Sequence, residues 1–388
     1  MMFQSRALLR LLVASALIVC FRRNSAALDA DPKIESARRT IKQIQEKFAP
    51  DTHLAIYDVE IEKKGDGFVL TGEVDKPEAA LETQRALASA GVSASNEIVV
   101  LPASDLGDQT WGISSLSVAN GREEPEQKAE LGTQVLMGHT VRIWKRNRRW
   151  FLVQTGDGYL SWVERGSLVR CDEKAAGDWQ NSKLVIVTAM EDQIVESPKA
   201  SAQPISDIVL GDLMKKLDEK REWYQVQLPD GRKGFIQKKA AQDFSAWKNS
   251  RKAEPQTIER TAKLFLGRPY LWGGNSPKGL DCSGFTKMVF FVNGIDLNRN
   301  ASHQALQGTS IPLDAELTNL KKGDLLFFGW PGRGDGQSRV SHVAIYLGDK
   351  TFIQSSQRVR VSSLDPASSL YDEQYGRSLV SARRILKE

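Results

Sequence analysis

An internal repeat constrains the fold of the middle of this chain more than any other feature of the sequence. Residues 150–163 (WFLVQTGDGYLSWV) match residues 223–236 (WYQVQLPDGRKGFI) at a constant offset of 73 residues, with no gap. In each copy apolar and polar residues alternate as in a β-strand, and Asp-Gly then gives the strongest short hairpin signal. We therefore expect two copies of a short-stranded β unit, over 111–172 and 180–243. A single irregular β domain is the alternative.

The first 27 residues have the pattern of an export signal. They hold four arginines and no acidic residue, around an apolar run of eleven residues from Leu11 to Phe21. A membrane-spanning helix needs about 20 residues, and the small residues at 25–27 are typical of a cleavage site. Cys20 follows the bulky Val19, which argues against lipoprotein anchoring. We therefore expect export to the periplasm or the extracellular space, without stable membrane insertion.

The composition indicates a globular protein of several domains without a strong charge. Of 388 residues, 41% are hydrophobic and 26% charged, which excludes wholesale disorder, and the chain is too long for one core. Without the four N-terminal arginines the net charge of +5 falls to +1, from 49 basic and 48 acidic residues. No nucleic-acid partner is therefore expected, and the basic run 142–149 is interpreted as a solvated loop. Residues 29–104 predict a small α+β domain of unknown role, with an amphipathic helix over 32–48.

A cysteine in the last domain, residues 255–388, has the surroundings of a catalytic nucleophile. A loop rich in Gly and Pro leads to Cys282, and a helical pattern of apolar residues follows it. At a helix N-terminus, unpaired N–H groups and the helix dipole favour a thiolate. The same groups can hold the oxyanion that forms when a thiolate attacks an amide. A buried inert thiol is the weaker interpretation, because Asp281 and Ser283 make a poor apolar pocket. Cys171 is expected to be a small buried or edge residue.

A thiol nucleophile needs a base, and His342 is the best placed of the four histidines. It lies in an alternating run, 340–347, and a second strand-like run follows Gly348-Asp349. If the loop has three residues, His342 lies directly opposite Gln354 on one face of the sheet. Gln354 can then orient the imidazole toward the cysteine. A loop of two or four residues would break this pairing. His303, in a short segment without an evident orienting partner, is the rival base.

These motifs together resemble the NlpC family of papain-like cysteine peptidases. The resemblance rests on residues 267–285, 321–328 and 341–348, in that order. With two units before them that look like tandem bacterial SH3-like barrels, the whole arrangement is similar to the γ-D-glutamyl-L-diamino acid endopeptidases. It implies a multidomain chain with a small α+β domain, two SH3-like β-barrels and an α+β papain-like peptidase domain. It also implies peptidoglycan stem peptides, L-Ala-γ-D-Glu-diamino acid, as substrates that are cut before the diamino acid.

The same resemblance implies roles for residues around the nucleophile. Tyr270, Asp281 and Ser283 would line the subsites, with Asp281 meeting the terminal amine of the substrate, and Gln354 is a neutral variant where the family often has histidine. The first barrel would contribute a glutamate and a tyrosine to the groove, and Glu130 and Tyr159 look like those positions. A carboxylate beside the nucleophile raises the thiol pKa unless a cation balances it. We expect the free amine of L-alanine to be that cation, so that the substrate is a stem peptide already released from glycan.

Two other functions fit the same residues. The first is that of an inactive wall-binding protein. The second is that of a Cys-dependent amidase or acyltransferase on the same fold. A serine hydrolase has no support, because no G-x-S-x-G motif occurs. The sequence also lacks H-E-x-x-H and a cysteine pair at ligand spacing, so we expect neither a metal nor a cofactor.

Overall fold

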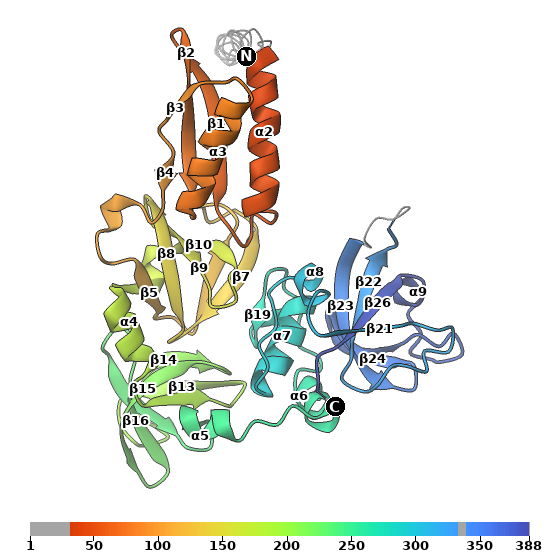
Figure 1. Cartoon of the computed structure of the whole chain (residues 1–388). Coiled ribbons are helices and arrows are strands. Elements are labelled where there is room, and N and C mark those ends of the chain that lie inside the picture. Colours follow the sequence, from red (N-terminus) through yellow and green to blue (C-terminus); the bar gives the residue numbers. More distant parts are fainter. Residues whose placement is uncertain (1–31, 333–338, 388) are drawn as a thin grey trace, which may run out of the picture. The chain divides into compact units, whose positions relative to one another are not determined.

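Figure 1 shows the computed structural model of this chain, which describes residues 32–332 and 339–387. The chain divides into two compact units, with the boundary between Ala103 and Ser104. The predicted export signal, residues 1–27, lies outside the described residues. Among the described residues, no helix is both long and apolar enough to cross a membrane.

The first unit packs two helices against a small sheet. The helix predicted over 32–48 has those bounds, and its buried residues follow the three- and four-residue steps of the sequence. Strand β2 pairs antiparallel with β1 and parallel with β3 and β4. The elements are α2 (Pro32–Phe48), β1 (Tyr57–Lys64), β2 (Gly67–Val74), α3 (Pro77–Ser89), β3 (Ala94–Asn96) and β4 (Val99–Val100).

The repeat forms two seven-stranded sheets with the same strand order. This order is β11-β5-β8-β9-β10-β6-β7 in the first and β18-β12-β15-β16-β17-β13-β14 in the second. The hairpins also share their register, because Gln154 pairs with Leu160 and Gln227 with Lys233. Each sheet encloses a core of its own, so the prediction of two SH3-like barrels is confirmed. We call them the first and second barrels.

The strands of the first barrel are β5 (Trp111–Ser114), β6 (Val118–Arg122), β7 (Leu131–Leu136), β8 (Thr140–Asn147), β9 (Trp150–Gln154), β10 (Leu160–Glu164) and β11 (Leu168–Cys171). Those of the second are β12 (Leu184–Val187), β13 (Glu191–Val195), β14 (Pro204–Val209), β15 (Leu213–Lys220), β16 (Trp223–Gln227), β17 (Lys233–Gln237) and β18 (Ala241–Asp243). Helix α4 (Glu173–Gln180) connects the barrels, and α5 (Phe244–Asn249) leads out of the second.

The last domain packs helices on an antiparallel sheet of order β21-β26-β22-β23-β24-β25. One face of this sheet packs against α7 through Val343, Ile345 and Ile353. The elements are α6 (Pro255–Lys263), β19 (Asn275–Ser276), β20 (Gly279–Leu280), α7 (Cys282–Val292), α8 (Ala301–Gln304), β21 (Thr309–Ile311), β22 (Leu325–Trp330), β23 (Arg339–Gly348), β24 (Thr351–Ser356), β25 (Arg358–Ser363), α9 (Glu373–Gly376) and β26 (Leu379–Arg384).

The barrels and the last domain share hydrophobic cores. Leu136 of the first barrel and Val209 and Leu210 of the second belong to the same buried cluster as Met288 and Val289 of α7. Polar contacts add to this packing, since Gln134 and Asn275 exchange hydrogen bonds of 2.7, 3.1 and 3.2 Å. The first barrel therefore packs directly against the last domain around α7.

Candidate active site

Cys282 is the first residue of α7, and Asp281 before it caps the helix. The Asp281 carboxylate accepts hydrogen bonds from the N–H of Gly284 at 2.7 Å and of Gly273 at 3.0 Å. Residue 284 must be glycine, because a Cβ there would lie 2.1 Å from the carbonyl oxygen of Gly274. The glycine-rich loop thus packs directly onto the first turn of α7. It holds a free thiol that is 8% exposed.

Arg299 forms a buried, two-pronged ion pair with Asp281. Its two terminal nitrogens lie 3.1 and 2.5 Å from the two carboxylate oxygens, and one of them also donates to the Ser283 hydroxyl at 3.0 Å. Arg299 is only 2% exposed. The expectation that the counter-charge of Asp281 comes from the substrate is therefore wrong, since the chain supplies it.

Arg299 was not among the predicted site residues, although the sequence holds a signal for it. Among residues 297–313, Arg299 is the single Asp, Glu, Lys or Arg. A lone arginine in an otherwise uncharged segment that follows a buried helix points to a buried partner. The sequence could not say which carboxylate that partner is.

Burial keeps both the thiol and the imidazole neutral. The pKa of Cys282 is raised to about 12, first by burial and then by the negative charge of Asp281, although the N–H of Val343 and the charge of Arg299 oppose this rise. The pKa of His342 is lowered to about 4, chiefly by burial, against the hydrogen bond that the imidazole donates to Gln354. Neither group is charged at neutral pH, so the proton must move when the substrate reacts.

The sequence-predicted pair of His342 and Gln354 is joined by a hydrogen bond of 2.6 Å between Nε2 and Oε1. The Gln354 amide nitrogen donates to the Ser362 hydroxyl at 2.9 Å, which turns the amide oxygen toward the imidazole. Nε2 therefore carries the proton, and Nδ1 keeps the lone pair that a base needs. Tyr375 stacks on the imidazole with ring centroids 4.5 Å apart, which limits its rotation.

The register that aligns these two residues differs from the predicted one. The turn consists of Asp349 and Lys350, both with positive φ, between the paired residues Gly348 and Thr351. A two-residue turn alone would place His342 and Gln354 on opposite faces of the sheet. A bulge between Tyr346 and Gly348 adds one residue and restores the parity.

The two side chains consequently lie on one face as diagonal neighbours rather than as a directly opposed pair. With Tyr346 opposite Phe352, the residue that faces Gln354 is Ala344. Diagonal neighbours are within reach of long side chains. The prediction of direct opposition is wrong, and the predicted contact exists because of the bulge.

His303, the rival base, is buried in α8. The next residue, Gln304, donates to the Ser283 carbonyl at 3.0 Å and accepts from Thr286 at 2.7 Å. Helix α8 thereby supports the first turns of α7. The hydrogen bond to Gln354 is made by His342.

Two tyrosines from different domains lie near the ion pair of Asp281 and Arg299. Tyr270 lies in the loop before α7, and its pKa is raised by burial and then by the neighbouring Cys282 and Asp281. Tyr159 comes from the turn between β9 and β10 of the first barrel, and the side chain of Asn300 and the charge of Arg299 both act on its hydroxyl. The first barrel therefore reaches the group that balances Asp281.

The glutamate beside Tyr159 is Glu123, not the predicted Glu130. The Tyr159 hydroxyl donates to the Glu123 carboxylate at 3.0 Å, whereas Glu130 is exposed. The two glutamates face each other across the β6–β7 hairpin, where the N–H of Glu123 bonds to the carbonyl of Glu130 at 3.0 Å. Sequence spacing could not choose between two such residues, because the choice depends on which side of the hairpin faces Tyr159.

Comparison with known proteins matches two regions of the chain to family models. Residues 267–384 match the model of the NlpC/P60 family, and residues 121–168 match that of the bacterial dipeptidyl-peptidase SH3 domain. "Dipeptidyl-peptidase 6" of Lysinibacillus sphaericus is 30% identical over 271 residues, which cover 66% of this chain and 92% of that protein. The chain belongs to the NlpC/P60 family.

Two further matches each cover about two thirds of this chain or more. "Gamma-D-glutamyl-L-lysine dipeptidyl-peptidase" of Bacillus cereus is 30% identical over 66% of this chain and 76% of its own length. The crystal structure of an NlpC/P60 family protein from Bacillus cereus, 25% identical, superimposes with a TM-score of 0.60 over 71% of this chain and all of its own. The protein is accordingly a cysteine peptidase with SH3-like domains.

Proposed function

We propose that this NlpC/P60 peptidase hydrolyses the bond between γ-D-glutamate and the diamino acid of peptidoglycan stem peptides that have a free N-terminal L-alanine. The observation that carries the proposal is the position of Tyr159 and Glu123. They reach from the first barrel to Asn300 and the surroundings of Arg299, whose guanidinium bonds to the residues on both sides of Cys282. The names of two relatives, each matched over 66% of this chain, support the same bond.

A carboxylate at the end of the groove provides the partner for a substrate ammonium. Asp281 already has the Arg299 guanidinium and the N–H groups of two glycines, so we assign the recognition of the amine to Glu123, aligned by Tyr159. In intact peptidoglycan the same nitrogen is an uncharged amide that carries a sugar. A groove closed by the first barrel would exclude it.

The chemistry follows from the neutral thiol and the neutral imidazole. Nδ1 of His342 takes the thiol proton as the sulfur attacks the γ-glutamyl carbonyl, and N–H groups of the first turn of α7 stabilise the oxyanion. The imidazolium then gives its proton to the departing amine of the diamino acid, which leaves a thioester on Cys282. Water, activated by the same imidazole, hydrolyses the thioester. Gln354 accepts from Nε2 throughout and holds the ring.

The first prediction compares L-Ala-γ-D-Glu-L-Lys with its N-acetylated form. Acetylation removes the charge that Glu123 would meet, so kcat/KM should fall by at least about a hundredfold, or roughly 2.7 kcal/mol. Mass spectrometry of the products should show a free diamino acid. Cys282→Ala, which should fold normally and cleave neither peptide, is the control.

Three results would decide against this proposal. Equal cleavage of both peptides would indicate an open groove and an enzyme that acts on the intact wall. A product other than the free diamino acid would support an amidase or acyltransferase. Binding without turnover would support an inactive wall-binding protein.

We also propose that the enzyme works outside the cytoplasm, in the periplasm or the extracellular space. The support is the export-signal pattern of residues 1–27, together with a substrate that is a fragment of the cell wall.

A further inference from the structure

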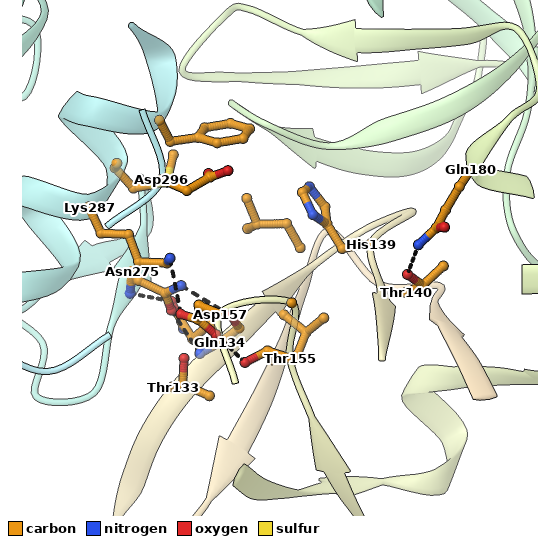
Figure 2. Close-up of a pocket in the computed structure, with 15 residues that line it drawn as sticks. Thr133, Gln134, His139, Thr140, Thr155, Asp157, Gln180, Asn275, Lys287 and Asp296 are labelled. Atoms are coloured by element: carbon orange, nitrogen blue, oxygen red, sulfur yellow. Dashed lines mark hydrogen bonds and ion pairs between the residues drawn. The ribbon is translucent and has the colours of Figure 1, made fainter. Parts of the chain in front are cut away.

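The turn between β9 and β10 of the first barrel contacts the peptidase domain at two points. At one, Asp157 forms an ion pair with Lys287 of α7, with 3.0 Å between Oδ2 and Nζ. At the other, Tyr159 bonds to Asn300, just before α8. Figure 2 shows Asp157 and Lys287 directed toward each other at the wall of a cleft between the first barrel and α7. The ion pair and the tyrosine are two positions apart in one turn.

The ion pair is largely removed from water. The side chains of Asp157 and Lys287 are 11% and 18% exposed, and Lys287 also donates to the carbonyl of Leu297 at 2.5 Å. Burial by itself would raise the pKa of Asp157, but the charge of Lys287 and the surrounding hydrogen bonds outweigh it and lower that pKa. Asp157 is therefore ionised, and loss of either partner leaves a poorly solvated charge.

The Asp157 carboxylate bonds both to its own turn and to α7. Its Oδ1 atom accepts from the Thr155 hydroxyl and from the N–H of Tyr159, the latter at 3.5 Å. Its Oδ2 atom meets Lys287. A change at Asp157 thus acts directly on the backbone that carries Tyr159.

The second barrel contains the same turn with a different use of the carboxylate. Asp230, the counterpart of Asp157, accepts from the N–H of Arg232 at 3.2 Å through Oδ1. Its Oδ2 atom accepts from Nε of the same Arg232 at 2.7 Å. Arg232 is the counterpart of Tyr159. The second barrel therefore contains a matched turn in which the carboxylate bonds to a residue of its own barrel.

We propose that Asp157 and Lys287 are a positioning pair that holds Tyr159 at the end of the substrate groove and so sets the preference for peptides with a free N-terminus. The inference rests on the proposed function. Neither residue touches the substrate, and both act through Tyr159.

The test is a double-mutant cycle of Asp157→Asn and Tyr159→Phe in the full chain, with the free and acetylated tripeptides. Asp157→Asn keeps the shape of the side chain and removes the charge. It should lower kcat/KM for the free peptide at least about tenfold through KM, with kcat nearly unchanged, because a contact remote from the reacting bond is lost. The preference for the free over the acetylated peptide should shrink by the same factor. The double variant should match Tyr159→Phe within about twofold, because both changes remove one function.

Three further variants protect the test against a general loss of structure. Lys287→Met should reproduce the effect, and Lys287→Arg should restore most of it. Asp230→Asn, the same change in the matched turn, should leave both peptides unaffected. Thermal unfolding is recorded for every variant.

The inference is overturned if Asp157→Asn cleaves both peptides like the wild type, or if its effect adds fully to that of Tyr159→Phe. A drop in kcat alone with the preference intact also contradicts it, since this is what a general structural role predicts. A wild type that fails to cleave the tripeptide, or that shows no preference, refutes the proposed function instead.

Discussion

At the scale of single residues, the thiol and the imidazole of the proposed site are both neutral at neutral pH. The pKa of the His342 imidazole is lowered to about 4 and that of the Cys282 thiol is raised to about 12. A histidine with a lowered pKa stays unprotonated above that value, so the base is ready over the whole neutral range. Burial therefore disfavours an ion pair of thiolate and imidazolium in this geometry.

Gln354 allows the charge on this base to be tested. Gln354→Glu places a carboxylate at the position of the amide oxygen, 2.6 Å from Nε2. A negative charge stabilises the imidazolium, so the pKa of His342 should rise. The acid limb of the pH profile of kcat/KM, expected near pH 4 in the wild type, should move upward by at least about one unit.

Gln354→Ala is the companion variant. It frees the imidazole to rotate without adding a charge, so kcat should fall roughly tenfold to a thousandfold, or about 1.4–4 kcal/mol of barrier. An acid limb that Gln354→Glu leaves in place, or wild-type kcat in Gln354→Ala, would show that Gln354 does not govern the imidazole.

Residue types and their local order were enough to identify the parts of the site that local structure determines. A cysteine before an apolar helical pattern and a histidine in an alternating strand need no knowledge of distant contacts. Arg299 and Glu123 were missed because their roles depend on long-range pairing. Arg299 meets Asp281 across 18 positions of the chain, and Glu123 meets Tyr159 across 36.

At the scale of elements, two local irregularities set the site. The bulge in the β23–β24 hairpin decides the parity that places His342 and Gln354 on one face. No sequence pattern indicated the bulge, because a three-residue loop without a bulge also places these two residues on one face of the sheet. The second is at the start of α7, where the capping residue, Asp281, also forms a buried ion pair with Arg299.

Asp281→Asn separates the capping role from the charge. The amide oxygen can still accept from the N–H of Gly284, while the negative charge beside the sulfur disappears. Removal of a negative charge favours the thiolate, and Arg299 then acts on it unopposed, so the pKa of Cys282 should fall by at least about one unit. The pH dependence of alkylation by iodoacetamide measures this pKa. The free energy of unfolding should fall by about 3–5 kcal/mol, because Arg299 is left buried without its ionic partner.

A second buried ion pair in the same domain provides the control. Arg384 bonds to both oxygens of Asp324 at 2.9 and 2.8 Å. Asp324→Asn should cost similar stability and leave the thiol pKa unchanged. An equal shift of the alkylation midpoint in both variants would attribute it to loosening of the domain rather than to charge.

At the scale of the whole molecule, the units differ in what they share. The core of the first unit consists of residues between Ile34 and Ile98. The core around α7, in contrast, draws on both barrels, and Trp179, Leu213 and Trp247 join the barrels to each other. Tandem repeats are often treated as independent modules, but these two form parts of one hydrophobic core with the peptidase domain.

The last prediction follows from this shared core and compares two shortened chains. A chain that begins at Ser104 keeps every residue of the site, together with Leu136, Val209 and Leu210, which cover α7. Its kcat/KM for L-Ala-γ-D-Glu-L-Lys should stay within about threefold of the full chain, because the first unit contributes no residue to the proposed site or to the described core around α7. A chain that begins at Pro255 exposes the apolar face of α7 to water, so it should unfold at lower temperature and aggregate. It also lacks Glu123 and Tyr159, so any soluble fraction should cleave the free and acetylated tripeptides at similar rates.

Selective cleavage by the chain that begins at Pro255 would show that the peptidase domain alone recognises the free amine, and the role assigned to the first barrel would then be wrong.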